Sequence, residues 1–356
     1  MYFSDHSHHY DLDGDGTDDI LVDVNEPTVQ TIRMYIESLY APWASPKLDE
    51  NTALIIYMMD HGGFGKFQVN TGEYLKAIDM DKWLDELQQA TGCPITLIVE
   101  ACHSGTFIEL LAPTSDQKRI LISSSNRGVS RTDQQGMLSF SKFLFDLLTQ
   151  GNSMQKSFDQ VVQTISGFRL FKHQHPQLLQ NDLMLSADNS YIGGTFITAD
   201  ILPEIISTTE SQTIDAGPLT IQAEVTAMEG IQAVWISIVS PITKLPETNK
   251  EFETPILDSK RLNLQFSNGV NTYENQYNFS YNGDYIITFY AKDTWDNVSV
   301  KEICLTVENG LIYGDINSDQ SLNLIDAILA LKKVSDIDEG FDLNDVIYVL
   351  KGVSGM

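Results

Sequence analysis

The stretch that decides the fold is LIVEACHSGTF, residues 97–107. Its first residues favour a β-strand, which ends in two small residues, Ala101 and Cys102. His103, Ser104 and Gly105 then turn the chain toward an amphipathic segment. In open α/β sheets ligands bind at the carboxyl ends of the strands, so this position favours a reactive thiol. The alternative is a small buried hydrophobic residue at a strand end.

The surrounding sequence predicts an α/β domain with a mainly parallel sheet over residues 1–198. Continuous apolar runs bounded by polar or turn residues predict buried strands at 52–59, 94–101 and 118–125. Apolar residues spaced i, i+3 and i+4 predict helices that cover this sheet at 79–92, 139–151 and 153–168.

The pattern changes twice further along the chain. Over residues 199–309 the hydrophobic period becomes two, which predicts an all-β sandwich. Its strands are expected at 219–227, 233–239, 261–266, 285–291 and 304–309. Residues 310–356 are expected to form a small helical module with an acidic loop, and linkers are expected near 196–216 and 308–313.

The charge of the chain narrows the classes of partner. There are 49 acidic and 22 basic residues, and the net charge is -27. Such a chain repels nucleic acid and anionic lipid and favours cations such as calcium. No window has the roughly 18 apolar residues of a membrane span, so none is expected. Three cysteines without CxxC spacing indicate neither a disulfide framework nor a zinc site.

A second motif strengthens the case for catalysis at Cys102. LIIYMMDHGGFG, residues 54–65, is another apolar strand that ends in His61 and two glycines. Adjacent parallel strands would bring His61, as acid and base, to the same sheet edge as a Cys102 nucleophile. The backbone N–H groups of Gly62 and Cys102 are candidates for an oxyanion hole. The alternative is that the His-Gly pair is only a strand-terminating turn.

These two motifs resemble the legumain-type (C13-type) cysteine peptidases of the caspase-like superfamily, particularly bacterial members. The resemblance covers roughly residues 10–190 and implies a caspase-like sandwich with a His61/Cys102 dyad that cleaves peptide bonds through a thioester. It places Glu100 where legumains have an acidic residue lining the primary specificity pocket. Ser124 and Ser125 are further candidate substrate-binding residues. No cofactor is expected for catalysis.

The sequence departs from the legumain pattern at two places. Where legumains have a further pocket acid, this chain has Gly136, Met137 and Leu138, so asparagine specificity is not implied. The first strand of the superfamily, expected before the acidic loop near residue 11, is not apparent. This absence favours the rival hypothesis of an inactive adhesion or scaffold protein, whereas the presence of both His61 and Cys102 favours an enzyme.

The carboxyl-terminal acidic loop has the spacing of an EF-hand. Six oxygen-bearing residues occupy loop positions 1, 3, 5, 7, 9 and 12, a pattern that predicts structural calcium. They are Asp315, Asn317, Asp319, Ser321, Asn323 and Asp326. A partial repeat 19 residues later makes the segment similar to a dockerin, which implies a cohesin-type partner. Its first loop position falls on Val334, so one strong calcium site is expected.

A second acidic loop lies near the start of the chain. Its candidate ligands for another calcium ion are Asp11, Asp13, Asp15, Thr17 and Asp19. Val22 occupies the twelfth position, where a calcium loop has an acidic residue, so a solvated acidic turn is the alternative. Residues 282–307 resemble the last strands of bacterial immunoglobulin-like domains, which implies that the sandwich spaces or positions the catalytic module.

Together the sequence predicts a multidomain cysteine endopeptidase with a protein or peptide substrate. Its domains are expected at 1–198, 199–309 and 310–356. An extracellular or cell-surface location is expected, although the chain shows no signal peptide. A calcium-binding assembly module alone would account only for the last 47 residues.

Overall fold

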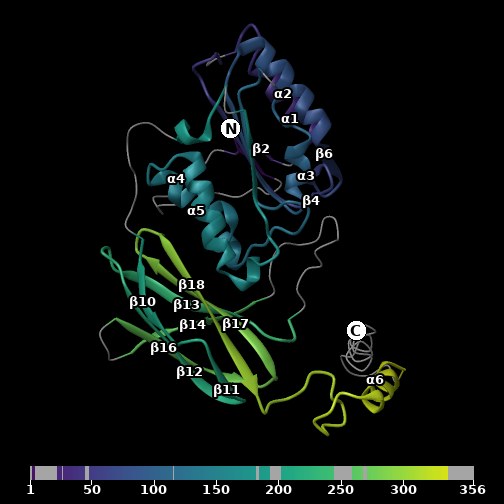
Figure 1. Cartoon of the computed structure of the whole chain (residues 1–356), viewed down its shortest axis with the longest axis vertical. Helices are drawn as coiled ribbons and strands as arrows, with labels where there is room; N and C mark the ends of the chain where they lie inside the picture. Colours follow the sequence, from purple (N-terminus) through teal and green to yellow (C-terminus); the bar gives the residue numbers. More distant parts are fainter. Residues whose placement is uncertain are drawn as a thin grey trace. The chain divides into compact units, whose positions relative to one another are not determined.

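The computed structural model describes residues 2–4, 22–25, 27–44, 48–114, 116–181, 184–192, 202–243, 259–267 and 271–335. The predicted amino-terminal calcium loop and the second dockerin-like repeat lie outside these residues. The chain divides into two compact units near residue 200, and each is described by itself (Figure 1).

The first unit is α/β. Its strands are β1 (Tyr2–Ser4), β2 (Val22–Asn25), β3 (Leu54–Met59), β4 (Gly62–Gly63), β5 (Lys66–Asn70), β6 (Glu73–Lys76), β7 (Ile95–Glu100), β8 (Arg119–Ser123) and β9 (Gln177–Gln180). Its helices are α1 (Val29–Ser38), α2 (Ala77–Thr91), α3 (Ser104–Glu109), α4 (Phe140–Thr149) and α5 (Met154–Ser166). The three strands and three covering helices predicted from sequence are therefore confirmed.

The central sheet has the order β3-β7-β8-β9. The first three strands are parallel, and β9 adds an antiparallel edge. Every residue of β7 and of β8 is buried, as expected of strands that are covered on both faces. The mainly parallel sheet predicted from the apolar runs is thus confirmed. Residues 62–76, which no pattern had assigned, form the small sheet β4-β5-β6.

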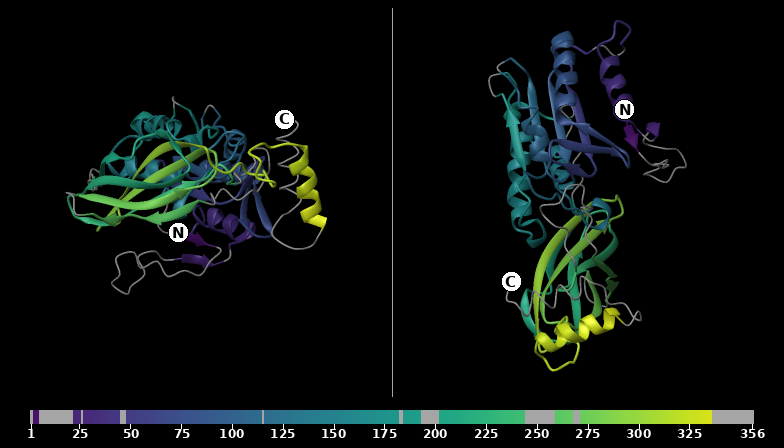
Figure 2. Two further views of the ribbon diagram at one scale, coloured as in Figure 1. Left: turned by 90° about the horizontal axis from the view of Figure 1, so that it is seen from below. Right: turned by 90° about the vertical axis from the view of Figure 1, so that its right-hand side faces the viewer.

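Helices cover both faces of this sheet (Figures 1 and 2). On one face, Leu84 of α2 and Phe107 of α3 share an apolar core with Leu97 of β7. On the other face, the ring of Tyr57 in β3 contacts Phe145 of α4, with 5.2 Å between the ring centroids. This three-layer arrangement is compatible with the predicted caspase-like sandwich.

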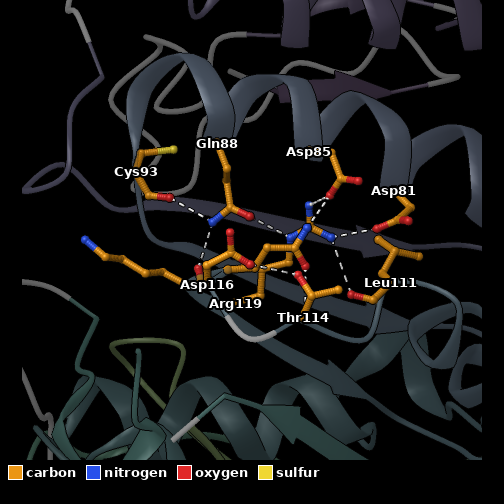
Figure 3. A network of polar contacts seen from close by, with 10 residues as sticks. Asp81, Asp85, Gln88, Cys93, Leu111, Thr114, Asp116 and Arg119 are labelled. Carbon is orange, nitrogen blue, oxygen red and sulfur yellow. Dashed lines mark hydrogen bonds and ion pairs between the residues drawn. The ribbon is translucent and has the colours of Figure 1, made fainter. Parts of the chain in front are cut away.

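The strands of the sheet begin at what we term the amino edge, where a buried arginine joins β8 to α2 (Figure 3). Arg119, whose side chain is fully buried, donates to Asp81 at 2.7 Å and to Asp85 at 2.6 Å. It also donates to the side-chain oxygen of Gln88 at 2.8 Å. The three acceptors lie three or four residues apart along α2, so they share one helix face.

The second unit contains a two-sheet β-sandwich. One sheet has the order β10-β12-β16-β15 and the other β11-β18-β17-β13-β14. Its strands are β10 (Glu204–Thr208), β11 (Gln212–Asp215), β12 (Gly217–Thr226), β13 (Ile231–Val239), β14 (Lys260–Asn263), β15 (Gln265–Phe266), β16 (Thr272–Phe279), β17 (Gly283–Asp293) and β18 (Val298–Glu308). A shared core of inward-facing side chains includes Ile236 and Phe289. The all-β prediction is confirmed, and the immunoglobulin-like assignment stays a prediction.

Two details of the second unit correct the sequence analysis. The expected linker at 196–216 contains the strands β10 and β11, which pair with β12 and β18. The strand β16 was not predicted because its sequence, TYENQYNF, is mostly polar. It fits the sheet because one of its faces is solvent-exposed, which antiparallel sheets allow. Beyond the sandwich, helix α6 spans Leu324–Ser335 and follows the acidic loop.

None of the helices in the described ranges combines the length and the apolar character that crossing a membrane requires.

Candidate functional site

His61 and Cys102 occupy equivalent places on neighbouring strands. Met59 of β3 pairs with Glu100 of β7, and each motif residue follows two positions later. The N–H of Asp60 donates to the carbonyl oxygen of Glu100 at 3.3 Å, which continues the pairing beyond the strands. Both motifs therefore lie at the end of the sheet opposite to Arg119, which we term the carboxyl edge.

The packing of Gly62 brings the two motifs into direct contact. A Cβ atom at this position would lie 2.1 Å from the carbonyl oxygen of Cys102 and 2.9 Å from the Cβ atom of Ala101. Only glycine leaves room for such a close approach of two backbones. The glycine after the histidine thus fixes the His61 motif against the Cys102 motif.

The thiol of Cys102 lies deep in the carboxyl edge. The residue is 1% exposed, and its Sγ atom lies 3.7 Å from the carbonyl oxygen of Ser130. The N–H groups at the start of α3 do not stabilise a thiolate, because those of Ser104, Gly105 and Thr106 already donate to backbone carbonyls.

A different positive charge is available to the thiol. Burial lowers the pKa of the Arg131 guanidinium, and the negative charge of an ionised Cys102 opposes that shift. The opposing effect places the guanidinium within electrostatic reach of the sulfur. A neighbouring cation stabilises a thiolate relative to a thiol. The positive charge that acts on Cys102 therefore comes from a loop rather than from a helix end.

A small cavity opens at the carboxyl edge beside these groups. Its volume is about 260 Å³, and His61 and Arg131 face it together. The residues that line it end or follow β3, end or follow β7, or belong to the loop after β8: Met59, Asp60, His61, Glu100, Ala101, Ser130, Arg131 and Thr132. A larger cavity, of about 550 Å³, lies between α1 and β3 and has a mostly apolar lining that includes neither His61 nor Cys102. We take the smaller cavity as the candidate substrate site because His61 lines it, together with Glu100 and Ala101, which directly precede Cys102; Cys102 itself is not part of the lining.

Glu100 lines the cavity, but its carboxylate holds the start of α4. The backbone N–H groups of Phe140 and Ser141 donate to its two oxygens, each at 3.0 Å, and the Ser141 hydroxyl also donates to it. Burial raises the pKa of Glu100, and these hydrogen bonds oppose the increase. The predicted contact with substrate stays a prediction, whereas a role in positioning α4 is evident.

Ser124 and Ser125 lie beneath the surface of the carboxyl edge, and their predicted contact with substrate stays a prediction. Both are fully buried, and neither lines the cavity. Ser124 donates to the hydroxyl oxygen of Ser130 at 2.7 Å, and the Ser125 hydroxyl donates to the carbonyl oxygen of Ala101 at 3.1 Å. They therefore lie behind the lining and hold it in place.

Sequence reasoning missed Arg131 and Thr132. Both belong to the loop that follows β8, the third strand to reach the carboxyl edge. The rule that ligands bind beyond the carboxyl ends of strands could have marked this loop. No local pattern, however, distinguishes Arg131 from the neighbouring Arg127, which is exposed and pairs with Glu109. The proposed backbone donors of Gly62 and Cys102 stay a prediction.

In the acidic loop before α6, side-chain oxygens bind the loop's own backbone. The N–H of Asp319 donates to Asp315 at 3.1 Å and to Asn317 at 3.0 Å. Burial raises the pKa of the Asp326 carboxyl, but donors from Asn323, Asn317 and Ile316 together hold the pKa below its ordinary value. Within the described residues, no group of three His, Cys, Asp or Glu side chains has the arrangement of a metal site. The carboxylate and amide oxygens of the loop are nevertheless the donor types that calcium takes.

A cysteine and a histidine at adjacent strand ends of an α/β sheet define a site of the cysteine-peptidase class. Residues 47–184 match the model of the Peptidase C13 family, so this segment is a legumain-like peptidase domain. The match supports a hydrolase that acts on protein substrates. It does not include the sandwich or the acidic loop before α6.

Comparisons of the whole chain add little. No curated protein matches it. Among solved structures, CopC from Methylosinus trichosporium OB3b is 12% identical, with a TM-score of 0.22, 30% of this chain covered and 93% of the other. The fibronectin(III)-like modules of Clostridium thermocellum CbhA are 17% identical, with a TM-score of 0.20 and coverage of 31% and 49%. Dimeric latent PorU from Porphyromonas gingivalis is 9% identical, with a TM-score of 0.23 and coverage of 54% and 20%. Likenesses this weak carry no argument.

Proposed function

We propose that the first unit is a thiol-dependent endopeptidase with Cys102 as nucleophile and His61 as general acid and base. The observation that carries this proposal is the contact of Gly62 with the backbone of Cys102. It holds two reactive side chains at neighbouring strand ends, beside a cavity large enough for one substrate side chain. Fixed placement of the reacting groups is a large part of enzymatic rate enhancement.

The proposed reaction has two steps. The thiolate of Cys102 attacks the carbonyl carbon of the scissile bond, the C–N bond breaks, and His61 gives its proton to the leaving amine. His61 then takes a proton from water, whose oxygen attacks the thioester, and the C–S bond breaks to release the acid and the thiolate. Backbone N–H groups of Gly62 and Cys102 would stabilise the oxyanion in each step.

The test uses the difference in exposure between two thiols. Cys102 is 1% exposed, whereas Cys304 of the sandwich is partly exposed. An electrophilic peptide probe should label Cys102 and spare Cys304 if activation, rather than exposure, controls reactivity. His61→Ala should prevent the labelling, and Cys102→Ala should abolish peptide hydrolysis while Cys304→Ala leaves it unchanged. Labelling of Cys304 alone, or full hydrolysis by Cys102→Ala, would contradict the proposal and favour the scaffold hypothesis.

We further propose that the loop before α6 binds one calcium ion and tethers an extracellular enzyme to a cohesin-type partner. The convergence of the Asp315 and Asn317 side chains on the backbone N–H of Asp319 supports a preformed ligand loop. The ion would offset the repulsion between its carboxylates, so metal binding would contribute to folding of the segment. Asp326 would hold the loop against the start of α6.

Calorimetric titration of the full chain with calcium tests this second proposal. We expect one strong site that Asp326→Asn weakens by at least tenfold, because position 12 supplies a charged ligand. The exposed Asp188, which lies outside the loop, provides the control Asp188→Asn. Equal calcium affinity in the wild type and in Asp326→Asn would contradict the assignment of the loop.

A further inference from the structure

The cavity at the carboxyl edge is lined by a cation on which no carboxylate among the described residues acts. Arg131 is 5% exposed and lines the cavity. Its backbone N–H donates to the side-chain oxygen of Gln174 at 2.9 Å, which anchors the loop. Only burial and Cys102 influence the pKa of its guanidinium, so no carboxylate in the described part of the chain acts on it. Buried charges are ordinarily paired, and Cys102 is the single described group that acts on this one, so the guanidinium retains hydrogen-bond donors for an anionic ligand.

A second polar group of the lining also lacks a partner. The Oγ1 atom of Thr132 is buried and has no hydrogen-bond partner among the described residues. Thr132 follows Arg131 directly, and both residues line the cavity. A guanidinium offers only donors, and a hydroxyl can add another. The unsatisfied groups of the cavity therefore match an anionic acceptor.

The acidic residues of the lining do not fill this role. Both carboxylate oxygens of Glu100 accept hydrogen bonds from the start of α4. Asp60 accepts the N–H of His61 at 2.6 Å. Neither acid shifts the pKa of the Arg131 guanidinium. The Arg131 end of the cavity is thus open to a negative group from outside.

We propose that Arg131 and Thr132 bind an acidic side chain, Asp or Glu, on the substrate residue that precedes the scissile bond. The inference rests on the proposed endopeptidase function. The cavity adjoins the Cys102 motif and His61, so a side chain within it belongs to a residue next to the attacked carbonyl. Its volume of about 260 Å³ lies below the range of roughly 300–1,000 Å³ of sites for whole small molecules, which suits a single side chain. Guanidinium groups bind carboxylates by two parallel hydrogen bonds.

Peptides that differ only at this residue test the proposal. We expect kcat/KM to be about tenfold or more higher for Asp or Glu than for Asn, Gln or Lys, because hydrogen bonds between charged groups are the strong ones. Arg131→Gln should remove this preference, and Arg131→Glu should shift it toward Lys. The conservative Thr132→Val should reduce the preference by a few-fold. Arg127→Gln, in the same loop but outside the cavity, should retain it.

The same variants separate substrate binding from activation of the thiol. If Arg131 acted only on Cys102, Arg131→Gln would lower kcat/KM equally for every peptide and would shift the pH profile of iodoacetamide labelling. A uniform loss of this kind would overturn the proposal. So would a wild-type enzyme that cleaves after neutral residues as readily as after acidic ones.

Binding measurements keep the proposal testable without turnover. The full chain with Cys102→Ala should bind the Asp peptide about tenfold or more tightly than the Asn peptide, and adding Arg131→Gln should equalise the two dissociation constants. Equal constants without that second substitution would overturn the acidic specificity. A wild type that hydrolyses no peptide, combined with the expected binding preference, would instead remove the proposed catalysis and leave the binding site.

Discussion

Arg119 and Arg131 lie at opposite edges of one sheet and show how differently a fold can use a buried arginine. Arg119, at the amino edge, donates to two carboxylates and a glutamine of α2 (Figure 3). Arg131, at the carboxyl edge, lines a cavity, and no described carboxylate acts on it. The first arginine joins a helix to a strand, whereas the second keeps its hydrogen-bonding capacity for a ligand. A buried charge therefore indicates function when its neighbours leave it unsatisfied.

The largest effect is expected from a steric change at the carboxyl edge. Gly62→Ala would place a methyl group on the carbonyl oxygen of Cys102. We expect a loss of about 3 kcal/mol in the free energy of unfolding, since overpacking has such costs, together with loss of peptidase activity. Gly72→Ala is the control, because a Cβ atom there would meet only an ordinary contact at 3.7 Å. Urea unfolding of both variants measures the difference. Equal stability of Gly62→Ala and Gly72→Ala would contradict the close contact.

A substitution at the amino edge should lower the stability of the protein without changing its substrate specificity. Arg119→Met removes the ion pairs of a fully buried side chain, but Asp81 and Asp85 remain partly exposed and can be hydrated. We therefore expect a loss of about 2 kcal/mol, less than for a fully buried pair. Arg33→Met, which breaks an exposed pair with Glu37, should leave the stability nearly unchanged. A changed preference for substrate in Arg119→Met, measured where the protein is folded, would refute the division between the edges.

The buried Glu100 should make the stability of the protein depend on pH. Its pKa is raised, so the folded state keeps the proton that the unfolded state loses above the ordinary pKa of glutamate. Wild-type stability should therefore fall as pH rises through that value toward the higher folded pKa. Glu100→Gln introduces a side chain that does not titrate and that leaves N–H donors of α4 poorly matched. We expect this variant to lose about 1–2 kcal/mol in the free energy of unfolding relative to the wild type, with the largest loss at low pH. Urea unfolding measured across pH should show that the difference in stability between the wild type and Glu100→Gln shrinks as pH rises. The exposed Glu109→Gln is the control.

The smallest expected effect on stability belongs to Arg131. Because its guanidinium has no described ion-pair partner, Arg131→Gln breaks no ion pair and relieves the burial of a charge. We expect a change within about 1 kcal/mol, in either direction. Thermal unfolding of Arg131→Gln beside Arg119→Gln measures the contrast directly. A loss at Arg131 as large as that at Arg119 would mean that Arg131 is structural.

The sequence by itself determined the three parallel strands of the central sheet, three of the helices that cover it and the positions of His61 and Cys102. Continuous apolar runs predict buried parallel strands, and a reactive residue directly after such a run must lie at the carboxyl edge. Two motifs on adjacent strands could thus be paired before any coordinates. The alternating period also predicted the sandwich, except for β10 and β11, where a linker was expected, and for β16, which is polar on its exposed face.

Only the tertiary structure decided which side chains line the cavity and which hold it in place. Glu100, Ser124 and Ser125 are all polar and end neighbouring strands, yet Glu100 positions α4, and the two serines lie behind the lining. Arg127 and Arg131 share one loop, but only Arg131 turns inward to the cavity. These outcomes depend on contacts between residues distant in the chain. Spacing along the sequence fixes the edge that a residue reaches, whereas its partners in space fix whether its charge and hydrogen bonds remain available.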